Sequence, residues 1–106
     1  MDLRSKKCVP CEGGVGKLNQ DQIDALMPAL TGWAVREDRI QKRFTFGNFV
    51  EAMAFLNKVA AIAEEEGHHP DFSVHYNKVD MTLWTHAIGG LSENDFILAA
   101  KIEALL

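Results

Sequence analysis

The hydrophobic pattern of this chain changes period several times, and these changes constrain the fold more than any other feature. Apolar side chains recur every three or four residues over 20–29, from 49 to the glycine at 67, and from 93 onward, which is the spacing of amphipathic helices. Two segments between them, 33–46 and 72–84, alternate apolar and polar residues about a short polar turn, as β-hairpins do. The predicted order is therefore α-β-β-α-β-β-α, an α+β fold with a four-stranded antiparallel sheet covered by helices.

Cap residues predict where these helices begin and end. Asn19, Asn48 and Ser92 each precede a helical segment, where a short polar side chain can accept hydrogen bonds from the first turn. Gly67 can end the second helix in a left-handed conformation, and Pro70 favours extended geometry in the residue before it. The segment between Gly67 and Pro70 is therefore expected to be a helix exit that leads into a strand.

The length of 106 residues suits one domain, which we expect to span residues 18–106. Residues 1–17 are rich in glycine and lysine and lack apolar periodicity, so they are predicted to form a flexible leader. The leader contains one C-x-x-C, Cys8 and Cys11. A structural zinc site needs four ligands, so ordinary thiols are favoured, and zinc shared between the leaders of two chains is the alternative.

Charge and composition exclude several classes of function. Eleven Lys and Arg against fifteen Asp and Glu give a net charge of −4, which argues against direct binding of nucleic acid. No stretch approaches the roughly 20 apolar residues that cross a bilayer, so no membrane insertion is expected. The opening MDLRSKK is not followed by the apolar segment of a secretory signal. A cytoplasmic location is therefore expected.

All four histidines lie between positions 68 and 86, namely at His68, His69, His75 and His86. Histidine gives and takes protons near neutral pH and also binds metals, so this cluster points either to proton transfer or to a metal site. Adjacent histidines in an extended chain point to opposite sides, and no typical metal-ligand spacing is present although Glu64, Glu65, Glu66 and Asp71 are near in sequence. No metal is therefore predicted.

Proton transfer makes fewer geometric demands, because an acid and a base can act from different sides of a substrate. Trp84 and His86 share the parity that is opposite to Val79, Met81 and Leu83, so on a strand they would face away from the core. An imidazole placed in this way can face a cleft. His75, taken alone, is more typical of a surface residue.

A set of residues with fixed spacing resembles the signature of the pterin-4a-carbinolamine dehydratase family. The set consists of Glu64-x-x-x-His68-His69-Pro70, Tyr76, His86 and Asp95. The likeness extends back to the TGW at residues 31–33 and covers roughly residues 18–106, so the cysteine-containing leader lies outside it. The family's fold agrees with the order of elements read from periodicity.

The resemblance implies a lyase that dehydrates 4a-hydroxytetrahydropterin to quinonoid dihydropterin, in tetrahydropterin recycling, without a cofactor. By likeness to the family, His68 and His86 would be the proton-transfer pair and His69 would hold the pterin. Glu64 would orient an imidazole or raise its basicity, and the alternative is a solvated carboxylate. Pro70 would fix the backbone of His69.

Two further kinds of residue have open roles. Asp95 matches the last acid of the signature, but Ser92-x-x-Asp95 is also a capping box, which is the favoured role. Trp33 and Trp84 could form the walls around a flat pterin or pack in the core or an interface.

The resemblance also implies partners and alternatives. The expected substrate is a reduced pterin, and a homodimer or homotetramer is expected because relatives associate and small domains bury limited surface. One alternative function is a protein-binding dimerisation cofactor of a transcription factor, which would use a helical surface. Another is a metal-dependent hydrolase using the same histidines. The presence of all three signature histidines favours catalysis.

Overall fold

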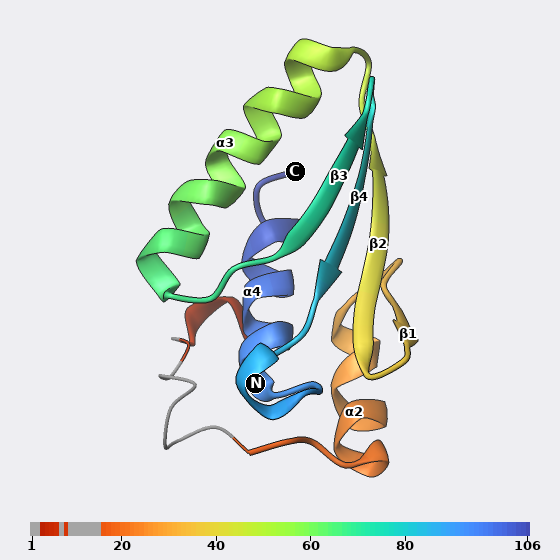
Figure 1. Ribbon diagram of the computed structural model, residues 1–106, viewed down its shortest axis with the longest axis vertical. Helices are drawn as coiled ribbons and strands as arrows, with labels where there is room; N and C mark the ends of the chain where they lie inside the picture. Colours follow the sequence, from red (N-terminus) through yellow and green to blue (C-terminus); the bar gives the residue numbers. More distant parts are fainter. Residues whose placement is uncertain (1–2, 7, 9–15) are drawn as a thin grey trace.

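Helices and strands follow one another in the predicted order in the computed structural model, which describes residues 3–6, 8 and 16–106 (Figure 1). Three α-helices, four strands and three short 3₁₀ turns make up this part of the chain. The elements are η1 (Leu3–Ser5), α2 (Gln20–Leu26), η2 (Met27–Ala29), β1 (Ala34–Arg36), β2 (Arg39–Thr45), α3 (Phe49–Glu66), β3 (Asp71–His75), β4 (Lys78–Leu83), η3 (His86–Ile88) and α4 (Glu93–Glu103).

The four strands form one antiparallel sheet in the order β1-β2-β4-β3. Two-residue turns close both hairpins. Glu37 and Asp38 have φ of 52° and 60° in the first turn, and Tyr76 has φ of 55° in the second, as the strand twist of tight hairpins requires. The polar pair Asn77 and Lys78 predicts this second turn one residue later than the structure has it. The alternation of apolar and polar residues cannot locate this turn, because Tyr76 continues the apolar pattern of the strand although Tyr76 itself lies in the turn.

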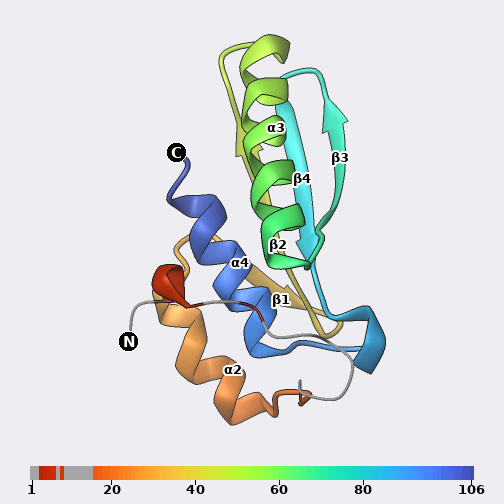
Figure 2. The same ribbon diagram turned by 90° about the vertical axis from the view of Figure 1, so that its left-hand side faces the viewer.

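Helices α3 and α4 cover the same face of the sheet, and α2 lies beside α4 (Figures 1 and 2). Ile40 and Phe44 of β2 face these helices, as do the three buried residues of β4, because side chains on a strand alternate between faces. The core is built from all the layers: Ile40, Phe44, Val79, Met81, Leu83, Phe55, Val59, Phe96, Ile97 and Ile102 are at most 5% exposed. Each such side chain contributes about 1.5–3 kcal/mol.

The other face of the sheet carries polar side chains. Arg43 of β2 lies opposite Asp80 of β4, and its guanidinium donates hydrogen bonds of 2.6 and 3.0 Å to that carboxylate. These hydrogen bonds lower the pKa of Asp80 and raise that of Arg43. Both side chains are partly exposed to solvent, so the pair contributes little to stability.

The predicted N-caps of all three helices are present, and so is the predicted glycine cap at the end of α3. Asn19 and Ser92 each form a capping box with the residue three positions later, and the Asn48 side chain accepts from the backbone N–H of Glu51. Gly67 ends α3 with φ of 67°, in the left-handed region. Residues 68–70 then link α3 directly to β3. None of the described helices is both long and apolar enough to cross a bilayer.

The described residues of the leader lie against the domain, and the flexible leader over residues 1–17 stays a prediction. Leu3 is 5% exposed and belongs to the core. The Lys6 ammonium lies 3.1 Å from the Glu93 carboxylate, and the backbone N–H of Cys8 donates to Glu66 at 2.8 Å. The leader's few anchoring residues repeat at no helical or strand period, so sequence pattern could not reveal them. Cys11 lies outside the described residues.

Candidate active site

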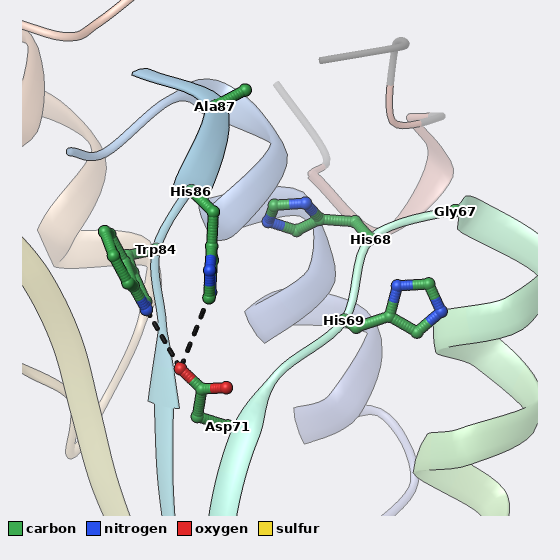
Figure 3. A pocket seen from close by; sticks show the side chains of 7 residues that line it. All are labelled: Gly67, His68, His69, Asp71, Trp84, His86 and Ala87. Atoms are coloured by element: carbon green, nitrogen blue, oxygen red, sulfur yellow. Dashed lines mark hydrogen bonds and ion pairs between the residues drawn. The ribbon is translucent and has the colours of Figure 1, made fainter. Parts of the chain in front are cut away.

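A pocket of about 370 Å³ opens where α3 and β4 end (Figure 3). Three segments contribute its walls: the link after α3, the first residue of β3, and the chain that leaves β4. The described residues that line it are Gly67, His68, His69, Asp71, Trp84, His86 and Ala87. Three of the four histidines and Trp84 therefore share one cavity, whereas His75 is exposed on β3 and Trp33 is buried in the core.

His68 is the buried histidine of the pocket, at 5% exposure. Its Nε2 lies 2.6 Å from Oδ1 of Asp95, which is fully buried. The other oxygen of Asp95 accepts from the Thr85 hydroxyl and the Ser92 backbone N–H, both at 2.9 Å. Asp95 thus caps α4 and also contacts an imidazole, so both roles considered for it are compatible.

The buried network continues to a second hydroxyl. Thr85 Oγ1 lies 2.7 Å from Ser92 Oγ, and both residues are fully buried. A buried carboxylate without partners would cost several kcal/mol, whereas Asp95 has hydrogen-bond partners at both of its oxygens. Asp95 is itself held by hydrogen bonds, so it fixes the orientation of the His68 imidazole from the side that faces α4.

His69 is turned toward α3, away from His86 (Figure 3). Its Nε2 lies 2.5 Å from Oε2 of Glu64, and both side chains are more than half exposed. Among the described contacts, Glu64 therefore pairs with His69 and not with His68, although Glu64 lies one helical turn before His68 in the sequence. The extended link after Gly67 explains this, because neighbouring side chains in extended backbone point to opposite sides.

His86 and Trp84 form the opposite wall of the pocket. Their rings stack at 4.0 Å with an angle of 28°, and the Arg39 guanidinium lies 4.2 Å from the centre of the Trp84 ring. The prediction that His86 lies on a strand is wrong, because β4 ends at Leu83 and His86 begins a 3₁₀ turn that Gly89 ends at φ of 63°. The turn nevertheless places the imidazole beside the indole.

Asp71 joins these two rings. Its Oδ2 accepts a hydrogen bond from Trp84 Nε1 at 2.9 Å and lies 3.6 Å from His86 Nε2 (Figure 3). From the sequence, Asp71 was noted only as a carboxylate near the histidines. The hairpin register could have identified it, because Asp71 pairs with Thr82 and Trp84 follows Thr82 with the same outward parity.

The remaining predicted positions lie outside the pocket. Pro70 is half-buried in the link between His69 and β3, and Trp33 donates from Nε1 to Glu103 at 2.8 Å in the core region. No group of three or more His, Cys, Asp or Glu side chains in the described part of the chain is arranged to hold a metal ion. The arrangement that is present pairs each pocket histidine with a carboxylate, which suits proton transfer.

Comparison with known proteins gives a consistent result. Residues 16–105 match the family described as pterin 4 alpha carbinolamine dehydratase. A protein of Nitrosospira multiformis is 53% identical over 104 residues, covering 98% of this chain and 92% of its own. A protein of Rickettsia canadensis is 51% identical over 104 residues, covering 96% and 95%. Both carry the provisional name pterin-4-alpha-carbinolamine dehydratase.

Solved structures share the fold. The crystal structure of a transcriptional coactivator/pterin dehydratase from Brucella melitensis is 34% identical with a TM-score of 0.82, covering 85% of this chain and 98% of that chain. A pterin dehydratase-like protein identified as a RuBisCO assembly factor in the alpha-carboxysome is also 34% identical, with a TM-score of 0.57, covering 69% and 84%.

Proposed function

Because the chain belongs to the pterin 4 alpha carbinolamine dehydratase family, we propose that it is a hydro-lyase that dehydrates 4a-hydroxytetrahydropterin to quinonoid dihydropterin. The observation that carries the proposal is the pocket in which imidazoles from two separate segments, His68 and His86, line one cavity. Each of these imidazoles lies beside a carboxylate, Asp95 or Asp71.

The reaction needs two proton transfers and no change of oxidation state. A proton is delivered to the hydroxyl on C4a, the C4a–O bond breaks, and water leaves with the bonding electrons. A ring nitrogen loses a proton, and its electron pair forms the new double bond to the ring carbon. One proton is delivered and one is withdrawn, so the two histidines together end the cycle with the protons they held at its start.

His68 and His86 are the proton-transfer pair in this proposal. A positioned acid or base contributes about 10²–10⁴ in rate, and the two act from different walls of the cavity. His69 holds the pterin, and Glu64 orients its imidazole, in keeping with their 2.5 Å contact. Asp95 positions His68 from the buried side. Trp84 lines the cavity and supports the His86 ring by stacking on it.

Stopped-flow kinetics test the proposal. Enzymatically generated 4a-hydroxytetrahydropterin is followed as it decays to the quinonoid form, with wild type, His68→Ala and His86→Ala. We expect each substitution to lower kcat by about 10²-fold, because each removes one proton-transfer group. His75→Ala is the matched control, since His75 is exposed on β3 outside the pocket, and it should retain the wild-type rate.

Two outcomes would count against the proposal. A wild-type protein that leaves the spontaneous decay unchanged would refute the dehydratase function. Full activity in both pocket variants would refute the histidine roles while leaving the reaction in place.

The proposal includes self-association into a homodimer or homotetramer. Apolar side chains on α3 and β3 support it, because Phe49, Val50 and Phe72 are 48%, 74% and 51% exposed in the single chain. The edge strand β3 is also available for pairing. The cytoplasmic location expected from the sequence stays a prediction.

A protein-binding role is the second candidate function, and the double description of the Brucella melitensis structure favours it. Such a role would use surfaces outside the pocket. The His68→Ala and His86→Ala variants distinguish the two, because a binding function would survive both substitutions and the dehydratase would not.

A further inference from the structure

We infer that Asp71 is a positioning residue for His86, whose carboxylate keeps the proton of the neutral imidazole on Nε2 and so assigns proton exchange with the substrate to Nδ1. The second half of this inference rests on the proposed function. The first half concerns the protein alone and is tested without any substrate.

The geometry around Asp71 carries the inference. One of its carboxylate oxygens, Oδ2, faces both rings of the pocket wall, at 2.9 Å from Trp84 Nε1 and 3.6 Å from His86 Nε2. The indole N–H can only donate, so it holds this oxygen in place as an acceptor. The negative charge that is held 3.6 Å from Nε2 attracts a proton on that nitrogen electrostatically, and so favours the tautomer with its proton there.

The two rings are themselves held together. Trp84 and His86 stack at 4.0 Å, and the Arg39 guanidinium lies 4.2 Å from the centre of the indole ring. Trp84 thus has contacts through its N–H edge and its ring. If His86 rotated away from Asp71, its stacking on Trp84 would be lost. The indole and the carboxylate therefore restrict the orientation of the same imidazole.

The consequence for the chemistry concerns the second ring nitrogen. In a neutral imidazole one nitrogen is a donor and the other an acceptor. With the proton kept on Nε2 by Asp71, Nδ1 carries the lone pair and takes up the proton that the pterin ring nitrogen loses. The imidazolium then releases this proton from Nδ1 to water before the next cycle, while His68, which delivered a proton to the leaving hydroxyl, takes one up. Without the carboxylate, part of the population would carry its proton on Nδ1 and be unable to accept one there.

The test uses two substitutions at the same position and one matched control. Asp71→Asn keeps the shape but loses the charge and adds an N–H donor, whereas Asp71→Glu keeps the charge. Asp80→Asn is the control, because Asp80 is also a charged residue on the outward face of the sheet, paired with Arg43 and outside the pocket. Thermal unfolding of each variant shows that it is folded.

The first measurement is the tautomer of His86. Two-bond ¹H–¹⁵N correlation spectra of ¹⁵N-histidine-labelled protein are recorded at a pH of about 8, where free imidazole is neutral, and His86→Ala assigns the signals. We expect Nε2–H to predominate in wild type, Asp71→Glu and Asp80→Asn, and a mixture of tautomers in Asp71→Asn. A wild-type pattern in Asp71→Asn would overturn the inference.

The second measurement is the rate of 4a-hydroxytetrahydropterin dehydration. We expect Asp71→Asn to lower kcat about tenfold with little change in KM, since orientation is only part of the contribution of an acid–base group. Asp71→Glu should recover most of the loss. An unchanged kcat in Asp71→Asn would refute the role in catalysis. A wild-type protein without dehydratase activity would instead refute the proposed function, and the spectra would still decide the tautomer.

Discussion

Asp95 is the residue on which the hydrogen bonds of the site converge. It accepts from Thr85 and the Ser92 backbone and lies 2.6 Å from His68 Nε2. Because it is fully buried, replacing its carboxylate leaves several polar groups with weaker partners. A single side chain therefore links the stability of α4 to the orientation of a pocket histidine.

Asp95→Asn is accordingly expected to lower both stability and activity. Loss of a buried charged acceptor costs about 2–4 kcal/mol in the free energy of unfolding, measurable by urea denaturation. Asp80→Asn, in which an exposed ion pair is lost, should cost less than about 1 kcal/mol. Equal effects of the two substitutions would contradict the importance of the buried network.

Glu64→Gln tests the exposed pair on the other side of the link. Glu64 and His69 are 78% and 60% exposed, so the free energy of unfolding should change by less than about 1 kcal/mol. If His69 holds the pterin, KM should rise while kcat changes little. A loss of kcat with unchanged KM would instead indicate that Glu64 acts in proton transfer.

Sequence reasoning reached the histidines but not their partners. The spacing of the signature indicated that His68, His69 and His86 belong to one site, and all three line one pocket. The pairing of each imidazole with its carboxylate depends on the direction of side chains in the extended link after Gly67 and on the hairpin register. Neither could be read from spacing alone, which is why Asp71 and Thr85 were missed.

The same limit holds at the scale of elements. Periodicity and caps located the helices and both hairpins, because their apolar faces are continuous over many residues. The 3₁₀ turn at His86–Ile88 has no period to detect, so His86 was expected to lie on a strand although β4 ends at Leu83. The leader contacts were missed for the same reason, since Leu3 is an isolated anchor in the core and Cys8 is an isolated anchor on α3 and α4.

The leader contacts predict an unreactive thiol at position 8. Burial, with the nearby Glu66 carboxylate as the next cause, raises the pKa of Cys8 to about 12, so the thiolate that reacts with disulfide reagents is scarce at pH 8. In a Cys11→Ser background, Cys8 should react slowly with Ellman's reagent in the folded protein and rapidly in denaturant. Rapid reaction of the folded protein would contradict the packed leader.

The raised pKa also gives the sign of a pH effect on stability. A thiol whose pKa is higher in the folded than in the unfolded chain favours folding while it stays protonated. This contribution is complete below a pH of about 9, the ordinary value, and is lost as the pH rises toward about 12. Cys8→Ser should therefore show a weaker fall in stability over this range, measured by denaturation at a series of pH values.

At the scale of the whole molecule, the single chain leaves apolar side chains exposed along α3 and at β3. Val50 is 74% exposed and Phe72 is 51% exposed, and β3 is an edge strand. We expect light scattering coupled to gel filtration to give a mass of two or four chains. Val50→Glu should shift this mass downward or make it depend on dilution, whereas a wild-type monomer at all concentrations would contradict the proposed assembly.

The central claim is that His68 and His86 act on one pterin ring from two walls of the same pocket. The most direct test is a crystal structure of the protein soaked with a stable 7,8-dihydropterin. The account predicts that the ring lies in the pocket within hydrogen-bonding reach of both imidazoles. A ring bound elsewhere, or one in contact with only one of these two histidines, would contradict it.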